Sequence, residues 1–243
     1  MHDLTQRQIE ILKSLIEEYI ESAEPVGSDT LEKKHNLSAS PATIRNDMVH
    51  LTKLGYLRKL HASAGRMPTP KGMRFYVKQL MKEKELSVAE EVAVKEGLWD
   101  FRLNDQRFFR EIARSLAEKT KAIAIVTTDE GDLFAAGYAN ILDMPEFYDI
   151  DITKTLLSVI DEYDCFKSVF QQKFEEEGVH VCLGEDLGPL LKGPYGVVFT
   201  DFKTKGNMSG DIGILGPERL NYMQIIPIVR YYSNLAGDMP DGW

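Results

Sequence analysis

The stretch that decides the fold of the N-terminal third runs Ser40-Pro-Ala-Thr-Ile-Arg-Asn-Asp-Met-Val-His-Leu-Thr-Lys-Leu-Gly55. Serine is a favoured helix cap, proline fits the first helical position, and glycine commonly follows the last turn. The stretch therefore predicts a helix that begins after Ser40 and ends before Gly55. Its apolar residues recur at the spacing of one helical face: Ile44, Met48, Leu51 and Leu54.

The outer face of this helix begins with small and polar side chains. A recognition helix needs such a face, because its first turns must approach the edges of the bases closely. Arginine can bond guanine with two hydrogen bonds, and asparagine can do the same with adenine. We predict that Thr43, Arg45 and Asn46 contact bases or lie beside them. Ser40 and the helix N-terminus are predicted to hold a phosphate.

Two shorter signals precede this helix. Thr5 and Gln8 form a capping-box pattern, and apolar residues such as Ile9, Leu12 and Ile16 follow at helical spacing. This pattern predicts an amphipathic helix over residues 5–22. A Pro-Val-Gly segment at 25–27 breaks it, and Ser28 can cap a second helix that ends near residue 35. The order is that of a helix-turn-helix.

The segment after Gly55 predicts a wing. Residues 55–61 and 67–68 read as two strands, and Pro68 restricts the second to a short or edge strand because it cannot donate to a ladder. A turn at 63–66 would place Arg66 at the tip, beside a phosphate or in a minor groove. Thr69 and Pro70 then begin a fourth helix, as cap and first position.

Charge is distributed unevenly along the chain. The 243 residues carry a net charge of −9, but residues 45–82 hold nine basic side chains and one acid, Asp47, for a local charge of +8. Affinity for DNA depends on the charges that reach phosphates. The alternative is a solvated basic face without a ligand. If the segment binds DNA, we expect phosphate contacts from these basic residues: Lys53, Arg58, Lys59, Arg66, Lys71 and Arg74.

The rest of the chain predicts a different architecture. Residues 83–104 read as a helical linker, with a capping box at Ser87 and Glu90 and a helix that ends near Gly97. Residues 105–243 alternate helical and strand patterns. Helices are predicted at 104–119, 152–163, 166–177 and 219–235, and strands at 122–127, 133–140, 179–183, 195–202 and 208–215. This order predicts an α+β domain with a mainly antiparallel sheet.

Several function classes find no support in the sequence. It has no apolar run long enough to span a membrane and no signal-peptide pattern. Two cysteines fit a reduced cytoplasmic protein better than a disulfide framework. Phosphate-binding loops, nucleophile elbows and metal-spaced Cys/His clusters are missing, so we predict no enzyme activity, no cofactor and no metal.

The chain resembles the heat-inducible transcription repressor family HrcA. The resemblance runs nearly unbroken from Leu4 to Tyr76, and it is specific because the wing segment is not general among winged helices. It rests on these stretches: Leu4-Thr-Gln-Arg-Gln-Ile9, Glu24-Pro-Val-Gly-Ser28, Ser40-Pro-Ala-Thr-Ile-Arg-Asn-Asp-Met48, His61-Ala-Ser-Ala-Gly-Arg-Met-Pro-Thr69, Gly137-Tyr-Ala-Asn-Ile-Leu142 with Pro145-Glu-Phe147, and Gly210-Asp-Ile-Gly-Ile-Leu-Gly-Pro-Glu-Arg-Leu-Asn-Tyr222.

The resemblance implies a function. Members of this family carry a winged helix-turn-helix at the N-terminus, here residues 1–82, and a GAF-like domain behind it, here 105–243. They bind an inverted-repeat operator upstream of chaperone operons, and the GroEL–GroES chaperonin keeps them active. We therefore expect a double-stranded DNA operator, a homodimer and a GroEL-type chaperonin as partners. Twofold symmetry of the protein would match the inverted repeat.

The sequence departs from the family in length. Members carry an inserted dimerisation subdomain within the GAF-like domain, and here the predicted hairpin at 122–140 closes where that insertion should stand. Dimerisation mode and chaperonin control therefore cannot be copied from the family.

Two alternatives stay open. One is a winged-helix regulator of another operon, controlled by a small-molecule effector in the GAF-like domain. The other is a GAF-like thiol reductase that uses Cys165 and Cys182; free cysteines more often act as small core hydrophobes.

Overall fold

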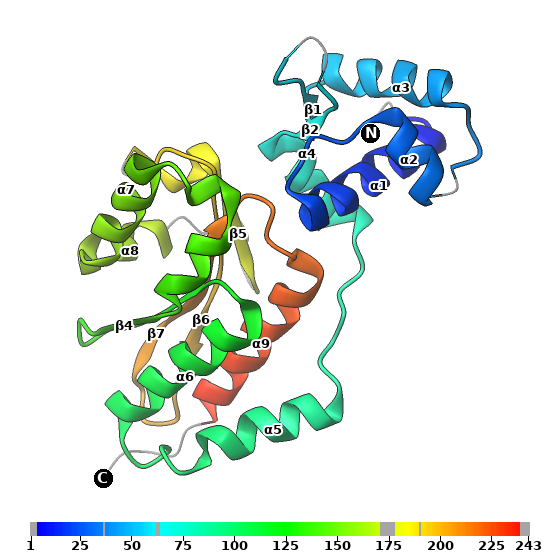
Figure 1. Cartoon of the computed structure of the whole chain (residues 1–243). Coiled ribbons are helices and arrows are strands. Elements are labelled where there is room, and N and C mark those ends of the chain that lie inside the picture. Colours follow the sequence, from blue (N-terminus) through cyan, green and yellow to red (C-terminus); the bar gives the residue numbers. More distant parts are fainter. Residues whose placement is uncertain (1–3, 36, 62–63, 171–177, 190, 239–243) are drawn as a thin grey trace. The chain divides into compact units, whose positions relative to one another are not determined.

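The computed structural model describes residues 4–35, 37–61, 64–170, 178–189 and 191–238. Their contacts divide the chain into two compact units, Met1–Lys82 and Glu83–Trp243. Figure 1 draws both units with their helices and strands labelled. Among these residues, no helix has both the length and the apolarity that a membrane crossing requires.

Unit 1 opens with three helices, α1 (Gln6–Ser22), α2 (Ser28–His35) and α3 (Pro41–Lys53). The predicted caps Thr5 and Ser40 are confirmed, whereas Ser28 is the first residue of α2 and not its cap. Thr5 and Gln8 make a reciprocal capping box, and the Ser40 hydroxyl accepts a hydrogen bond from the backbone of Thr43. The core of the unit is built from fully buried aliphatic residues of these helices: Ile11, Leu12, Leu15, Ile16, Leu31, Ile44 and Leu51.

A small hairpin follows the helices. Strand β1 (Leu57–Arg58) pairs antiparallel with β2 (Met67–Pro68), with Leu57 opposite Pro68. Thr69 caps α4 (Pro70–Phe75), which continues as a π-helical turn, η1 (Tyr76–Leu80). The predicted winged helix-turn-helix is thus confirmed. The strand that contains Pro68 is short, as expected because proline has no backbone N–H to donate to the neighbouring strand.

Unit 2 is an α+β fold around a five-stranded sheet. Its strands are β3 (Ile123–Thr128), β4 (Leu133–Ala136), β5 (His180–Leu183), β6 (Tyr195–Lys203) and β7 (Ser209–Pro217). Their order is β4-β3-β7-β6-β5, and every neighbouring pair is antiparallel. The predicted α+β class with an antiparallel sheet is confirmed.

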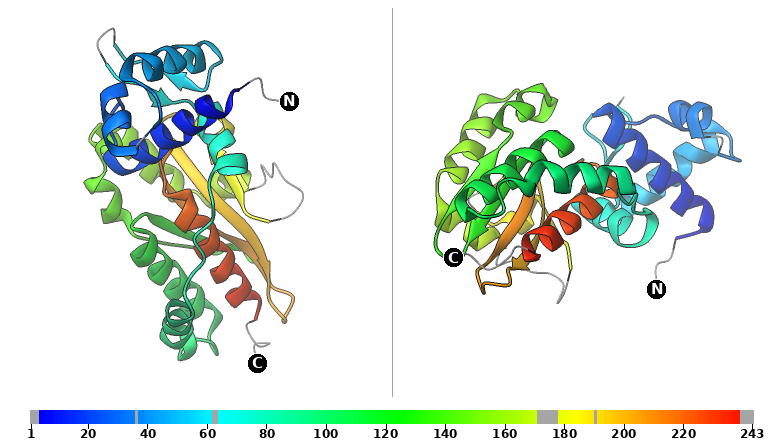
Figure 2. Two further views of the ribbon diagram at one scale, coloured as in Figure 1. Left: turned by 90° about the vertical axis from the view of Figure 1, so that its right-hand side faces the viewer. Right: turned by 90° about the horizontal axis from the view of Figure 1, so that it is seen from below.

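Helices cover both faces of this sheet. On one face lie α6 (Asp105–Thr120) and α9 (Tyr222–Gly237), and on the other α7 (Ile150–Ile160) and α8 (Tyr163–Phe170) (Figures 1 and 2). Three short 3-10 turns, η2 (Tyr138–Asp143), η3 (Pro145–Phe147) and η4 (Gly184–Leu187), join the elements. Helix α5 (Val88–Trp99) packs beside α6.

Four predicted boundaries in unit 2 are wrong. The helix predicted at 152–163 begins at Ile150 and ends at Ile160. Helix α5 runs through Gly97 to Trp99, because a solvent-exposed glycine weakens a helix without ending it. The strand predicted at 133–140 ends at Ala136, because Gly137 adopts a φ of 86° and turns the chain. The last helix begins at Tyr222, not at Arg219.

A fifth boundary differs in part. The helix predicted at 166–177 begins earlier, at Tyr163, and runs to Phe170. The remainder of that prediction, 171–177, lies outside the described residues.

Candidate nucleic-acid interface

The outer face of α3 presents the side chains that the sequence singled out for base contacts. Arg45 and Asn46 are exposed, and Thr43 is half-buried. The hydroxyls of Ser40 and Thr43 lie 3.0 Å apart at the start of the helix. Pro41 has no N–H and the Thr43 N–H is capped by Ser40, so the positive end of the helix dipole is the feature of this helix end that favours a phosphate.

Asp47, the one acid in the basic segment, points away from this face. It is only 7% exposed. It accepts hydrogen bonds from Arg7 Nε at 2.7 Å and from the Gln8 amide at 3.2 Å, both on α1. Its charge is therefore paired inside the unit, and the exposed face of α3 carries no acidic side chain.

The two leading candidates on this face are held differently. Arg45 reaches back to α2, where its guanidinium lies 3.4 Å from the Ser28 hydroxyl. Asn46 makes no side-chain hydrogen bond to another described residue, so its amide is available to a base edge. Lys53, in the last turn of α3, is exposed as well.

The wing does not have the geometry that the sequence predicted for Arg66. Arg66 lies at the base of the returning arm, where its backbone pairs with Val26 through two hydrogen bonds of 2.8 and 2.9 Å. Its Nε donates to Thr52 on α3 at 3.1 Å. The predicted position of Arg66 at the tip of the wing is wrong. The bridge between Val26 and Arg66 holds the returning strand of the hairpin against the segment before α2. Residue 63 of the predicted turn lies outside the described part.

The other predicted phosphate contacts divide into two groups. Arg58 and Lys59 on the wing are exposed. Lys71 is exposed too, but its ammonium donates to the carbonyl of Leu54 at 2.7 Å and lies 4.5 Å from the centre of the Tyr56 ring. Arg74 is half-buried. Lys71 and Arg66 therefore tie the wing and α4 to the end of α3.

Two glycines that we did not single out allow this wing to form. A Cβ at Gly65 would stand 2.5 Å from the carbonyl oxygen of Val26, and one at Gly72 would stand 2.2 Å from that of Tyr56. Any side chain would push the backbones apart. Gly65 stands in the wing stretch His61–Thr69, but the spacing of glycines along the sequence does not reveal which backbones approach each other.

Among the described residues of unit 2, no comparable set of side chains converges. Cys182 is buried in the core beside the sheet, and nothing is described of the Cys165 side chain. No group of three His, Cys, Asp or Glu side chains in the described ranges could hold a metal ion.

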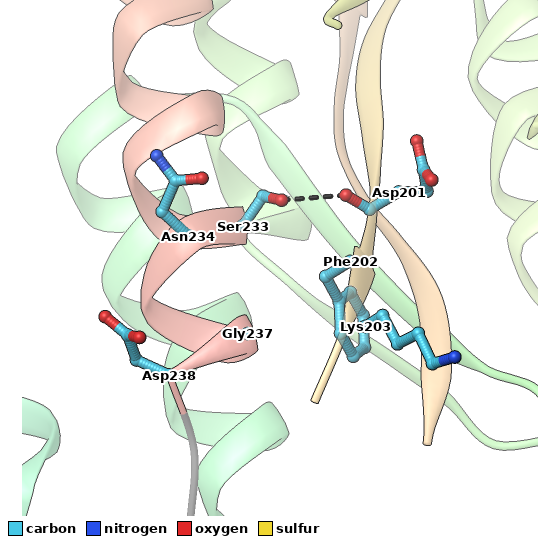
Figure 3. Close-up of a pocket in the computed structure, with 7 residues that line it drawn as sticks. All are labelled: Asp201, Phe202, Lys203, Ser233, Asn234, Gly237 and Asp238. Atoms are coloured by element: carbon cyan, nitrogen blue, oxygen red, sulfur yellow. Dashed lines mark hydrogen bonds between the residues drawn. The ribbon is translucent and has the colours of Figure 1, made fainter. Parts of the chain in front are cut away.

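An open pocket of about 530 Å³ lies in unit 2 between β6 and α9 (Figure 3). Asp201 and Lys203 come from the strand, and Ser233 and Asp238 from the end of the helix. One hydrogen bond crosses it, from the Ser233 hydroxyl to the Asp201 carbonyl at 2.8 Å.

The arrangement of unit 1 defines a class of protein. Three helices, a two-stranded wing, and a third helix with an exposed basic and amide-bearing face are the features of a winged helix-turn-helix DNA-binding protein. Two family models match the chain. The winged helix-turn-helix DNA-binding domain of the HrcA transcription repressor matches residues 3–96, and the HrcA C-terminal domain matches residues 70–226. The chain belongs to the HrcA family.

Curated relatives agree over nearly the whole chain. The heat-inducible transcription repressor HrcA of Clostridium acetobutylicum is 26% identical over 328 aligned positions, which cover 93% of this chain and 95% of the relative. That of Pelotomaculum thermopropionicum is 24% identical over 331 positions, with 95% of each chain covered. Both alignments are longer than the 243 residues of this chain, so the relatives contain residues that align with no residue of this chain.

One solved structure shares the overall fold. It is described as a hypothetical protein, with a TM-score of 0.74, 18% sequence identity and 96% of both chains covered.

Proposed function

We propose that this protein is a heat-responsive, sequence-specific repressor that binds an inverted-repeat operator of chaperone genes as a homodimer. One observation carries the DNA-binding part. The exposed face of α3 holds Arg45, Asn46 and Lys53, while Asp47 is turned inward and paired with α1. The heat response rests on the relatives, which are named heat-inducible repressors.

The roles of the proposed residues follow from their positions. Asn46, Arg45 and Thr43 read base edges, and Ser40 with the α3 N-terminus binds a phosphate. Lys53, Arg58 and Lys59 supply phosphate affinity. Arg66, Lys71 and Arg74 contribute positive charge, while Arg66 and Lys71 also hold the wing against α3.

The proposal assigns one task to each part of the chain. Residues 1–82 bind DNA, and residues 105–243 form a GAF-like domain that carries regulation. The helical linker predicted at 83–104 belongs to the second compact unit, where α5 packs beside α6. The partners are a double-stranded operator, a second copy of the chain and a GroEL-type chaperonin, the last on the family resemblance alone. A repressor with these partners acts in the bacterial cytoplasm and performs no catalysis.

A small-molecule effector is the second candidate, and the pocket between β6 and α9 is the observation in its favour (Figure 3). Its volume of about 530 Å³ falls within the range of ligand sites, but such sites are mostly apolar and enclosed. Here Asp201, Lys203 and Asp238 are exposed and charged. Thermal stabilisation by a metabolite panel would favour the effector, and stabilisation by chaperonin alone would favour the first proposal.

Selection from a random-sequence duplex library tests the proposed function. The purified chain should enrich one motif repeated in inverted orientation, and that motif should occur upstream of chaperone genes. Enrichment of a motif found elsewhere in the genome would contradict heat-shock control. A library that stays random after repeated rounds would contradict sequence-specific binding.

A further inference from the structure

Helix α3 exposes one large apolar side chain on its polar outer face. Val49 is 38% exposed, and among the described residues of unit 1 only Leu60, on the wing, is another large apolar side chain that stays exposed. The opposite side of α3, with Ile44, Met48 and Leu51, is buried where the helix packs against α1 and α2. In Figure 1, α3 lies at the margin of unit 1. Val49 therefore points away from the core of the unit.

Val49 stands between the two residues proposed to read bases. At 100° per residue, Arg45 lies about 40° to one side of Val49 on the helix surface, and Asn46 lies about 60° to the other side. Ala42, two turns earlier and also exposed, lies within about 20° of Val49. The four residues follow the spacing i, i+3, i+4 and i+7, with which a recognition helix presents side chains to the major groove.

The stability of unit 1 does not account for a valine at this position. The side chain lies opposite the buried face and adds little to the core. A β-branched side chain also loses rotamer freedom in a helix, so alanine would favour the helix more at an exposed position. In the free protein, the valine keeps apolar surface in water, which is unfavourable.

The major groove offers one apolar group to such a side chain. Adenine, guanine and cytosine present hydrogen-bond donors and acceptors there, whereas thymine also presents its C5-methyl group. A valine placed against a polar base edge would leave a donor or an acceptor without a partner, which costs binding free energy. Against a thymine methyl, both apolar surfaces leave water together. The side chain of Val49 thus fits thymine better than any other base.

We propose that Val49 determines specificity by packing against the C5-methyl group of a thymine in each operator half-site. The inference rests on the proposed function and deepens it, because it assigns a base to one more residue of the same helix face. Residues three apart on a helix have Cβ atoms about 5–6 Å apart, and successive base pairs are about 3.4 Å apart. The thymine therefore lies within about two base pairs of the base that Asn46 reads.

Removal of single methyl groups from the DNA tests the contact. The duplex carries the motif that the chain selects from a random library, and each thymine of one half-site is replaced in turn by uracil. Uracil keeps the base pairing and lacks the methyl group. At one position near the base that Asn46 reads, the wild type should bind about fourfold more weakly, the value for one methyl group that stays in water. Fluorescence anisotropy measures the affinities.

The variant Val49→Ala completes the cycle. It should bind the thymine duplex roughly tenfold more weakly than the wild type, because both half-sites lose the contact. It should bind the thymine and uracil duplexes equally, because no apolar partner for the methyl group remains. Val92→Ala, which truncates an exposed valine on α5 of unit 2 in the same way, is the control and should keep the wild-type difference between the duplexes.

Thermal unfolding distinguishes a base contact from a structural role. Val49→Ala introduces a better helix former at an exposed position, so its melting temperature should equal or slightly exceed that of the wild type. A lower melting temperature together with equal losses of affinity for all duplexes would show a structural role and would overturn the proposal.

The two proposals fail in different ways. If the wild type prefers its motif but no uracil substitution weakens binding, or if Val49→Ala stays sensitive to the methyl group, the Val49 contact alone is overturned. If the thymine contact holds but the motif is absent from chaperone genes, heat-shock control alone is overturned. If the wild type selects no motif and binds all duplexes equally, both sequence-specific repression and the Val49 contact are overturned.

Discussion

Arg7 donates its Nε–H to Asp47 at 2.7 Å and so joins the first turn of α1 to the middle of α3. The same carboxylate accepts from Gln8, whose amide nitrogen also lies 3.2 Å from His50 Nδ1. This small network fixes the rotation of α3 against α1. It removes the one acid of the basic segment from the surface and leaves Arg45 and Asn46 facing outward.

Asp47→Ala should lower the free energy of unfolding of unit 1 by about 1–3 kcal/mol, because it removes a buried carboxylate that accepts hydrogen bonds from both Arg7 and Gln8. Urea denaturation measures the change. Lys53→Ala on the exposed side of the same helix is the control and should leave the unfolding free energy within about 0.5 kcal/mol of wild type. Equal midpoints for Asp47→Ala and wild type would contradict the structural role of the network.

Asn46→Ala should relax specificity. Loss of a two-point hydrogen bond to a base should cost about 1–3 kcal/mol on the operator and nothing on random DNA. Fluorescence anisotropy with both duplexes measures the ratio. Equal losses on operator and random DNA would refute the base-reading role of Asn46.

Arg58→Ala should weaken binding to all duplexes and lower the slope of log K against log salt by about one, as expected for one lost phosphate contact. Arg66→Ala should show the same loss together with a lower melting temperature, because Arg66 also bonds Thr52. Lys154→Ala, an exposed lysine of unit 2, is the control. An unchanged slope for Arg58→Ala would remove this residue from the interface.

The N-terminal unit could be predicted from its sequence because its signals are local. Caps such as Ser40 and Thr69 and breakers such as Gly55 act within one or two turns, and each has the predicted role. The position of Arg66 could not be predicted, because it depends on a bridge to Val26, 40 residues earlier. The inward turn of Asp47 depends likewise on Arg7, a partner that spacing along α3 does not reveal.

In unit 2, too, the features set by local sequence could be predicted and those set by long-range contacts could not. The five strands and their antiparallel class were predictable, because apolar runs between turn residues identify strands. The early end of β4 was not, because it depends on the close approach of Gly137 to Ala122: a Cβ at Gly137 would stand 2.4 Å from the Ala122 carbonyl. Asn140 then donates to the carbonyls of Ala117 and Ala122 and holds the turn.

Glu18 should make unit 1 sensitive to acid. It is buried at the contact of α1 with α2, and a hydrogen bond from Lys34 at 2.6 Å lowers the pKa of its carboxyl below the ordinary value of 4.5. A lowered pKa contributes stability that is complete above the ordinary value and is lost as the pH falls through the folded-state pKa. Glu18→Gln should therefore flatten the decline in melting temperature below that pH. A decline as steep as in wild type would contradict this role.

The contributions of Arg219 and Glu146 to the stability of unit 2 should depend on each other. Two hydrogen bonds, of 2.5 and 3.1 Å, join them, and both side chains are about 85% buried, so Arg219→Ala leaves the Glu146 carboxylate without this ion pair. Arg219→Ala should destabilise unit 2 by about 3–5 kcal/mol. Arg219→Ala/Glu146→Ala should cost less than the sum of the two single changes. Strictly additive losses would show that the pair does not act as a unit.

The most direct test is equilibrium binding of the purified chain to a duplex that carries the family's inverted repeat, against a scrambled duplex, across a salt series. The account predicts at least about a thousandfold preference for the repeat, which is the range of site-specific binders. It also predicts a preference that persists as salt weakens both complexes. Equal and steeply salt-dependent affinity for the two duplexes would contradict sequence-specific repression through α3.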